Sequence, residues 1–329
     1  MTFLSILLAL LIEQLKPLRA DNPVYGGIKA YAVRVERWFN AGHADHGRLG
    51  WFVVMLTLVL PTLLIYWLCA QVSPLLMLGW NIVIIYLTLG FRHYSHYFTA
   101  IQYALNAGDT ETARQLLARW LRQDTTGMEV PEISRLAVEK ALLTTHRHVF
   151  GVFFWFLMPL GPAGAVMYRV AEYLARAWSE PEHMRSEAFG RFAIRAYYLM
   201  DWVPARLTAS AFAIVGNFED AVYAWRNFAQ RWQNETTGII LSAGGGAMGV
   251  RLGTPQENAT SLLLTMDAAT IDAATIDAAG VEAAAAEAET LPGEEPGVRS
   301  LQSTVGLVWR ALLLWMLLLL LISLAVWLG

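Results

Sequence analysis

The sequence predicts an all-α, polytopic integral membrane protein with about four to five transmembrane helices and with amphipathic helices on the cytoplasmic side. Composition is the first reason: 56% of the 329 residues are hydrophobic and only 16% are charged. Soluble domains contain about 45 to 50% apolar residues. The second reason is a set of long, almost charge-free runs, each close to the roughly 20 residues that a helix needs to cross a bilayer. We therefore expect membrane lipid to surround much of the chain.

The apolar runs predict the membrane-spanning elements in order. Residues 1–12 are apolar but too short to cross alone, and we interpret them as an uncleaved first helix. Residues 51–70 and 75–91 are joined by a short turn and predict a hairpin, whose Lys- and Arg-bearing flanks are cytoplasmic by the positive-inside rule. Residues 149–167 are interrupted by proline and glycine, which predicts a bent or re-entrant helix. Residues 305–328 form the final span.

The polar stretches between these runs predict the domain organisation. Residues 1–264 form a membrane domain with a cytoplasmic helical insertion at about 92–148. Residues 265–300 repeat Ala-Thr-Ile-Asp, and an acidic residue at every fifth position winds around a helix and leaves no apolar face. We predict a flexible acidic linker there, with a binding tail for a basic partner as the alternative. Residues 301–329 are the C-terminal transmembrane helix.

Charge and ligand types exclude several classes of function. A net charge of −3 provides no basic field for a phosphate backbone, so nucleic acid is not an expected partner. The single cysteine, Cys69, excludes an internal disulfide framework. His93 with His96, and His146 with His148, have neither Cys nor paired carboxylates at ligand spacing. We interpret these histidines as interfacial anchors rather than metal ligands and predict no protein-held metal site.

The candidate site is a polar cleft that faces the cytoplasm. Asp109 and Asp201 are the candidate catalytic residues, and they would orient an amine or a metal. Arginine suits the recognition of phosphate or carboxylate, and the glycine-rich stretch would add backbone N–H donors to an anion. The literal G-x-G-x-x-G that ends at Gly249 is weak as a dinucleotide fingerprint because no strand precedes it. The predicted substrate-binding residues are Arg114, Arg169, Arg206, Gly246, Gly249 and Arg251.

Several motifs together resemble the CobD/CbiB family. They include Asn22-Pro23-Val24, Tyr168-Arg169, the stretch Asp-Trp-Val-Pro-Ala-Arg-Leu-Thr-Ala at 201–209 and Gly246 to Gly253, in an order that covers nearly the whole chain except the acidic linker. The resemblance implies a bacterial inner-membrane protein of cobalamin biosynthesis that attaches aminopropanol phosphate to adenosylcobyric acid as an amide. It also implies ATP and Mg²⁺ if the ligase activity is retained, and a corrinoid or another phosphate-bearing small molecule as partner.

The chain departs from the family pattern at the acidic motifs. His146-Arg147-His148 stands where the family has Glu-Asn…Asp-Gly, Tyr197-Tyr198 replaces paired aspartates, and Asp201 replaces an Asn. Loss of these acids points away from the full ligase reaction, which needs carboxylates around Mg²⁺. The segment Phe-Trp-Phe…Gly-Pro-x-Gly-Ala…Tyr-Arg is also similar to AmpE. Two hypotheses therefore remain: a cobalamin biosynthesis protein first, and alternatively an AmpE-like, non-catalytic modulator of β-lactamase induction and cell-wall recycling.

Overall fold

The computed structural model describes an all-helical chain, which confirms the all-α part of the predicted fold class. Outside the helices and turns, its described residues contain one isolated β-bridge, between Val250 and Glu294. The described residues are 2–16, 18, 22–39, 44–178, 187–232, 234–253 and 293–328. They belong to two compact units, Met1–His96 with Thr144–Pro204 and Trp315–Gly329, and Tyr97–Leu143 with Ala205–Leu314.

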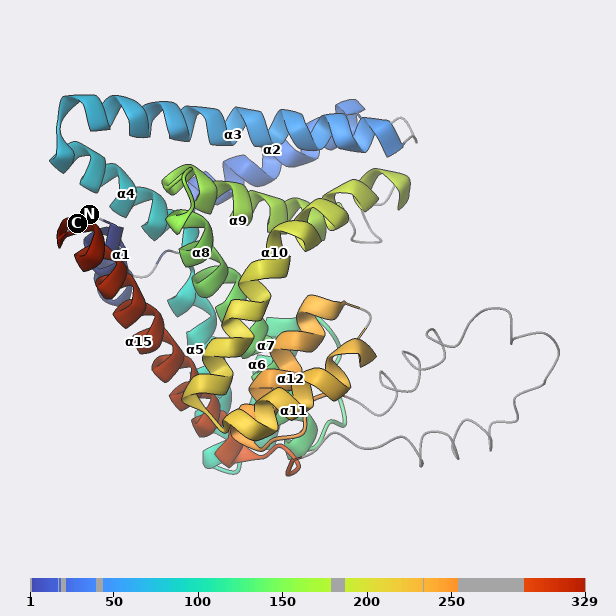
Figure 1. Cartoon of the computed structure of the whole chain (residues 1–329). Coiled ribbons are helices and arrows are strands. Elements are labelled where there is room, and N and C mark those ends of the chain that lie inside the picture. The colour runs from blue at the N-terminus through green and yellow to red at the C-terminus, as the bar shows by residue number, and fades with distance from the viewer. Residues whose placement is uncertain are drawn as a thin grey trace. The chain divides into compact units, whose positions relative to one another are not determined.

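The first unit holds most of the apolar helices (Figure 1). α3 and α4 form the predicted hairpin, and the Ser73 side chain caps α4 by accepting a hydrogen bond from the Leu75 N–H at 3.2 Å. α1 packs on α4, while α9 packs on α3, α4 and α8. The helices lying wholly in this unit are α1 (Thr2–Leu15), α2 (Pro23–Phe39), α3 (Ala44–Val72), α4 (Pro74–Thr88), the π-helix η1 (His146–Phe150), α8 (Gly151–Leu157) and α9 (Pro162–Ala177).

Two of the described helices are long and apolar enough to cross a membrane, by length and composition. They cover His46–Val72, in α3, and Val298–Ala325, in α15 (Val298–Leu328). Both contain predicted spans and begin earlier in the chain than the apolar runs indicated. α1 and α4 are apolar but shorter, so the run predicted at 75–91 forms a helix shorter than expected.

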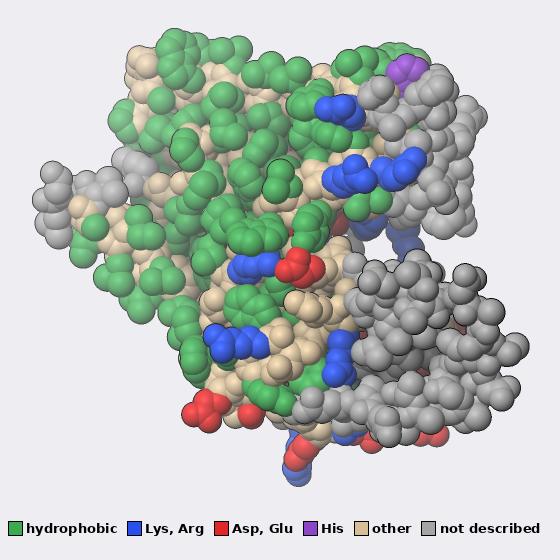
Figure 2. All heavy atoms as spheres, turned by 45° about the vertical axis from the view of Figure 1, so that its right-hand side comes forward, with side chains coloured by type: hydrophobic (Ala, Val, Ile, Leu, Met, Phe, Trp, Pro, Cys, Tyr) green, Lys and Arg blue, Asp and Glu red, His purple; other side chains and the backbone are tan. Residues whose placement is uncertain are grey.

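α3 exposes a largely apolar surface. Figure 2 shows hydrophobic side chains covering the top of the molecule, over α3. A soluble protein rarely exposes so large a contiguous apolar area, and the prediction of membrane contact accounts for it. The large exposed side chains of α3 include Phe52, Leu56, Leu60, Leu64, Trp67 and Leu68.

The apolar run at 149–167 is broken into two helices, as the sequence predicted. α8 ends at Leu157 and α9 begins at Pro162. Gly161 adopts a φ of 54°, in the region that favours glycine, and precedes the proline at the first position of α9. The break is therefore built into the backbone at this Gly-Pro pair.

The second unit contains most of the polar, amphipathic helices. Ala113 and Leu117 of α6 are buried, as are Ile133, Ala137 and Ala141 of α7. α11 packs on α12. The helices of this unit are most of α5 (Phe91–Asn106), α6 (Thr110–Leu121), most of α7 (Val130–Thr145), α11 (Phe218–Phe228), the 3₁₀ turn η2 (Ala229–Arg231), α12 (Glu235–Met248) and the first part of α15.

The stretch 201–209 lies inside a single helix. α10 (Glu187–Val215) runs through 29 residues with Pro204 in its interior, and it ends with the apolar run at 207–215. Proline removes one backbone hydrogen bond, yet Ala209 and Phe212 beyond it are fully buried, so packing sustains the helix past that residue.

Most of the predicted acidic linker lies outside the described residues. Its last residues, 293–297, are described, and Glu294 exchanges backbone hydrogen bonds with Gly249 (2.8 Å) and Arg251 (2.9 Å). α15 begins at Val298, three residues before the predicted boundary at 301.

Candidate functional site

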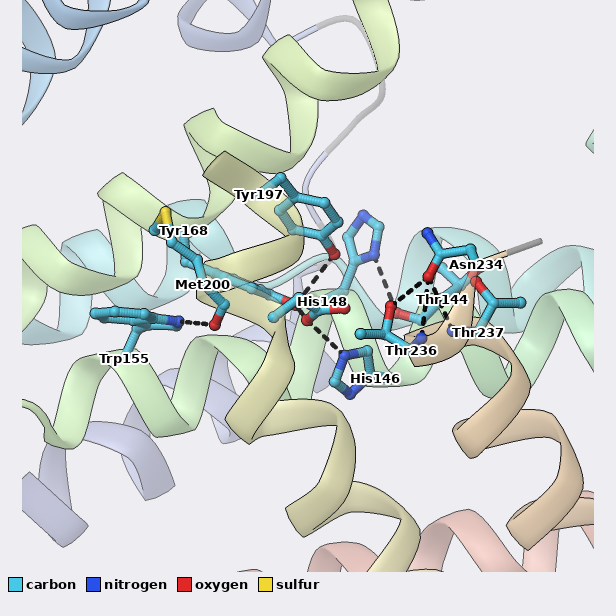
Figure 3. A network of polar contacts seen from close by, with 11 residues as sticks. Thr144, His146, His148, Trp155, Tyr168, Tyr197, Met200, Asn234, Thr236 and Thr237 are labelled. Atoms are coloured by element: carbon cyan, nitrogen blue, oxygen red, sulfur yellow. Dashed lines mark hydrogen bonds and ion pairs between the residues drawn. The ribbon is translucent and has the colours of Figure 1, made fainter. Parts of the chain in front are cut away.

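Polar side chains from η1, α9 and α10 are buried together in the first unit (Figure 3). Asp201 of α10 is 2% exposed. Its Oδ1 accepts hydrogen bonds from His146 Nε2 at 2.8 Å and from the Tyr168 hydroxyl at 2.7 Å. A carboxylate only accepts, so this contact assigns the Nε2 proton to His146. The Tyr168 and Tyr197 hydroxyls lie 3.3 Å apart, which joins Tyr197 to the same network.

Local backbone structure places His146 and Tyr168 in this network. The five residues of η1 form a π-helix, closed by a hydrogen bond from the Gly151 N–H to the His146 carbonyl. Such wide turns occur frequently at functional sites. A Cβ atom at Gly151 would overlap the Tyr168 ring and hydroxyl. Glycine at this position therefore lets the Tyr168 side chain lie against the backbone of α8.

The hydrogen bonds keep Asp201 ionised in a buried place. Burial alone raises the pKa of a carboxyl, but the charge and hydrogen bond of His146, the hydrogen bond from Tyr168 and the charge of Arg147 outweigh it. The pKa of Asp201 is therefore below its ordinary value. Burial and the nearby Asp201 carboxylate raise the pKa of Tyr197, so its hydroxyl stays protonated.

An arginine-rich group surrounds Glu172 on α9. Glu172 accepts a hydrogen bond from Arg169 at 3.1 Å, and Arg176 Nε lies 3.7 Å from its other oxygen. The Nε atom of Arg169 is buried and has no hydrogen-bond partner. Two guanidinium groups thus share one carboxylate.

Arg147 is close to the acidic residues but is not bonded to them. Its guanidinium is partly buried and makes no hydrogen bond or ion pair within the described part of the chain. Burial favours loss of its charge, but Tyr197, Glu172 and Asp201 outweigh this effect and hold its pKa above the ordinary value. Arg147 is therefore a charged donor group that no residue in the described part of the chain uses.

His148 lies two residues after His146 and is uncharged. Its Nδ1 donates to the Thr144 carbonyl at 3.0 Å. Burial, together with the charges of Arg169, Arg176 and Arg147, holds the pKa of His148 well below its usual 6.5. The two histidines of this motif are thus in different electrostatic settings.

The structure distributes the predicted site residues between the two units. Arg169 and Asp201 belong to the first unit and take part in the buried polar group described above. Asp109, in the second unit, is the N-cap of α6 and accepts the Thr112 N–H at 3.0 Å. These hydrogen bonds lower the pKa of Asp109. Asp109 thus has a structural role, and its catalytic role stays a prediction.

The remaining predicted arginines of the second unit have local partners. Arg114 Nε donates to the Met128 carbonyl at 2.7 Å, and its NH1 atom lies 3.1 Å from Glu111. Arg206 forms an ion pair of 2.6 Å with Glu235. Arg251 is exposed, and one guanidinium nitrogen contacts the Gly293 carbonyl at 3.4 Å. Their roles in substrate binding are not tested by these contacts and stay predictions.

The glycine-rich stretch does not form the predicted row of backbone donors. Gly244 and Gly246 lie inside α12, where the N–H groups belong to the helix. A Cβ at Gly246 would meet the backbone of Asp220 and Ala221 in α11, so this glycine permits close helix packing. Gly249 has a φ of 68° and ends α12. Substrate binding by Gly246 and Gly249 stays a prediction, but it does not use a row of free backbone N–H donors.

Sequence reasoning missed the part played by His146. The prediction of interfacial anchoring is wrong for this residue, because it is fully buried and bonded to Asp201; the side chain of His93 lies outside the described residues. One feature of the sequence did indicate this group of residues. Several of the positions at which the resemblance showed a departure from the CobD/CbiB pattern gather in space: His146, Arg147, Tyr197 and Asp201.

Comparisons with known proteins agree with the resemblance. A family model described as CobD/Cbib protein matches residues 4–288, a range that includes the whole buried network. A cobalamin biosynthesis protein CobD of Stutzerimonas stutzeri is 34% identical over 259 residues, 76% of this chain and 82% of that protein. Another CobD, from Chromobacterium violaceum, is 33% identical over 196 residues, 60% of this chain and 62% of that protein.

A third protein with the same name, from Yersinia enterocolitica, is 30% identical over 192 residues, 55% of this chain and 58% of that protein. No solved structure was found to match the chain. The comparisons support the first hypothesis and give no support to the AmpE-like alternative. By the extent of the family match and by these identities, this chain belongs to the CobD/CbiB family.

Proposed function

We propose that this protein acts in cobalamin biosynthesis, as the membrane protein that joins the amine of aminopropanol phosphate to a carboxyl group of adenosylcobyric acid. The family match over residues 4–288 and the relatives named cobalamin biosynthesis protein CobD support this proposal. Overall, the reaction forms one C–N bond, breaks one C–O bond of the carboxyl group and releases the elements of water. ATP, which the family resemblance implies, would let the departing oxygen leave as part of a phosphate. The reaction therefore needs groups that bind and orient an amine and an anion.

The observation that carries the proposal is the buried network around Asp201. It lies within the range that the family model matches, and Asp201 begins the stretch 201–209 that carries the family resemblance. A polar network with this degree of burial is expensive unless it is satisfied, and a purely structural core would favour apolar side chains. We assign Asp201 to orientation of the amine, with His146 and Tyr168 fixing its carboxylate.

The residues at this position do not fit Mg²⁺. Within the described residues, no group of three or more His, Cys, Asp or Glu side chains could hold a metal ion. Asp201 already accepts two hydrogen bonds at one oxygen, and Glu172 is held by Arg169 and Arg176. Mg²⁺ is usually held by one or two carboxylates together with substrate phosphates. We therefore assign no step to Mg²⁺ or ATP, which stay expectations from the family resemblance.

The proposal includes a multi-pass arrangement in the bacterial inner membrane with about four to five spans. α3 and α15 have the required length and hydropathy. The shorter α1 and α4 pack on each other and supply further apolar length. The broken pair α8 and α9 is compatible with a re-entrant segment, since non-helical backbone is tolerated at depth only where protein or a cavity covers it.

Complementation of a strain that lacks the amide-forming step tests the function. Wild-type protein is expected to restore cobamide output from adenosylcobyric acid, and Asp201→Ala is expected to restore much less at equal membrane levels. Failure of the wild type to rescue would overturn the proposal. The AmpE-like alternative predicts a different result, an altered β-lactam response on deletion of the native gene with normal cobamide output.

A further inference from the structure

Two charged groups of the buried network keep unused hydrogen-bonding capacity. Arg147 offers five N–H donors and makes no hydrogen bond or ion pair to any described residue. Asp201 accepts both of its hydrogen bonds at Oδ1, and within the described chain Oδ2 accepts none. Neither Oδ2 nor an Arg147 nitrogen is among the fully enclosed atoms without partners, although Asp201 as a whole is only 2% exposed.

The two groups are neighbours without being a pair. The charge of each acts on the other, but the salt bridge of Asp201 is made with His146 instead. A guanidinium and a carboxylate in a largely buried place would normally bond directly, because an unpaired buried charge costs several kcal/mol. In this fold, Arg147 and Asp201 form no direct hydrogen bond or ion pair. A molecule with an anionic end and a cationic end would satisfy both.

We propose that Arg147 and Asp201 together bind a short zwitterion, with its anionic group on the Arg147 guanidinium and its amine on Asp201 Oδ2. The class of ligand is an aminoalkyl phosphate. This inference rests on the proposed function and deepens it, because it assigns the amine-bearing substrate to the first unit and gives each of its ends a partner.

The surrounding charges favour phosphate over carboxylate at the anionic end. Arg147, Arg169 and Arg176 all act on His148, so three guanidinium groups lie around this imidazole. Glu172 is the carboxylate that pairs directly with two of them, and the buried Nε of Arg169 has no partner. A dianionic phosphate, with three terminal oxygens, uses such a surplus of donors better than a carboxylate does.

The assignment differs from the sequence-based one, in which Arg206 and Arg251 bind the anion. Arg206 already pairs with Glu235 at 2.6 Å. To bind a ligand, Arg206 would have to give up its carboxylate partner. Arg147 has no such partner among the described residues. Arg147 is thus the better candidate.

Direct binding to the full-length protein in lipid nanodiscs tests the inference, with isothermal titration calorimetry as the readout. Three probes separate the two ends: aminopropanol phosphate, propanol phosphate without the amine, and 4-aminobutyrate with a carboxylate in place of phosphate. Wild type should bind aminopropanol phosphate most tightly. Arg147→Gln should weaken both phosphate probes by about tenfold or more, since a charge-assisted contact is lost. Asp201→Asn should weaken aminopropanol phosphate by a similar factor and change propanol phosphate by less than about twofold.

Matched variants exclude a general loss of charge or fold. Arg119→Gln removes an exposed arginine of α6 and should bind as wild type does, while Arg147→Lys should recover part of the affinity for phosphate. Thermal unfolding of each variant identifies any that does not fold. Equal losses for both phosphate probes in Asp201→Asn, unchanged binding in Arg147→Gln, or no binding to wild type would overturn the inference.

Failure of this inference is distinguishable from failure of the proposed function. If wild type rescues the amide-forming step and Arg147→Gln still binds aminopropanol phosphate normally, the function stands and the site assignment is wrong. If wild type binds the zwitterion as described but does not rescue, the binding site stands and the proposed reaction is wrong.

Discussion

His146 and Asp201 are 55 residues apart in the sequence, yet His146 Nε2 lies 2.8 Å from Asp201 Oδ1 with both side chains buried. The same oxygen accepts the Tyr168 hydroxyl at 2.7 Å. One carboxylate oxygen therefore ties η1, α9 and α10 together. Because both donors bind the same oxygen, the loss of one hydrogen bond should alter the other. The two contacts should therefore be energetically coupled.

This coupling gives the first prediction. Tyr168→Phe should lower the free energy of unfolding by about 1.5 to 3 kcal/mol, the usual value of a hydrogen bond to a charged group. His146→Gln should have an effect of similar size, and the double variant should differ from the sum by more than about 0.5 kcal/mol. Denaturant unfolding of the purified protein measures all three. Tyr103→Phe, which changes an exposed tyrosine, is the control, and strict additivity would contradict the shared-acceptor arrangement.

A second prediction concerns acid sensitivity through His148. The unfolded chain takes up this proton near pH 6.5, whereas the folded protein does so only at a much lower pH. The unfolded state thus binds more protons below 6.5, so stability is fully present above that pH and falls as the pH drops below it. The slope from this one group is at most about 1.4 kcal/mol per pH unit.

The measurement compares the unfolding of wild type and His148→Asn across this pH range. The asparagine variant cannot take up the proton, and its stability should fall less steeply below pH 6.5. If both proteins lose stability equally, His148 is not the group that makes the fold acid-sensitive.

Gly151 supports a third prediction, about how Tyr168 is positioned. A methyl group at this position would overlap the Tyr168 ring, so Gly151→Ala should lower stability by about 1 to 3 kcal/mol, as overpacking usually does, and should reduce rescue of cobamide output. Gly27→Ala is the matched control, because Gly27 lies within α2 with nothing near its Cβ position. Alanine there should be neutral or stabilising by up to about 1 kcal/mol. Equal behaviour of the two variants would show that Tyr168 can shift without cost.

The glycine-rich stretch allows a fourth prediction, which separates packing from backbone conformation. Gly246→Ala should destabilise the α11–α12 contact because its Cβ would meet the Asp220 and Ala221 backbone. Gly249→Ala should cost about 1 to 2 kcal/mol for a different reason, its φ of 68°, and Gly249→Asn should cost less, since asparagine tolerates that region. Thermal unfolding ranks the variants. Similar losses for alanine and asparagine at 249 would argue that backbone conformation is not the constraint.

Sequence patterns were sufficient for the elements whose physics is local. The apolar runs predicted α3 and α15, and the proline and glycine residues predicted the break between α8 and α9. In both cases the relevant interaction is between near neighbours in the chain or between the chain and its solvent. The continuity of α10 through Pro204 is decided by tertiary packing rather than by local propensity.

The candidate site was predictable only in part, for the same reason. Asp201 was singled out by its charge beside an apolar run, but its contact with His146 joins segments far apart in the sequence. Composition gives no signal for such a pairing. The resemblance to the family did carry one, since several of the departures from its pattern, at His146, Arg147, Tyr197 and Asp201, occur at positions that meet in space. Asp109 shows the reverse case: its residue type indicated catalysis, whereas locally it caps a helix.

The ion pair between Arg206 and Glu235, 2.6 Å apart, supports the last prediction. The two side chains are 25% and 41% exposed, so the pair should contribute only about 0.2 to 1 kcal/mol to stability. If Arg206 serves mainly to hold Glu235, Arg206→Gln and Glu235→Gln should have equal, non-additive effects on unfolding, and both should rescue cobamide output as well as wild type. If Arg206 instead binds the substrate anion, Arg206→Gln alone should lose rescue while Glu235→Gln, which removes only this ion pair, keeps it. Complementation with both single variants and the double variant separates these outcomes.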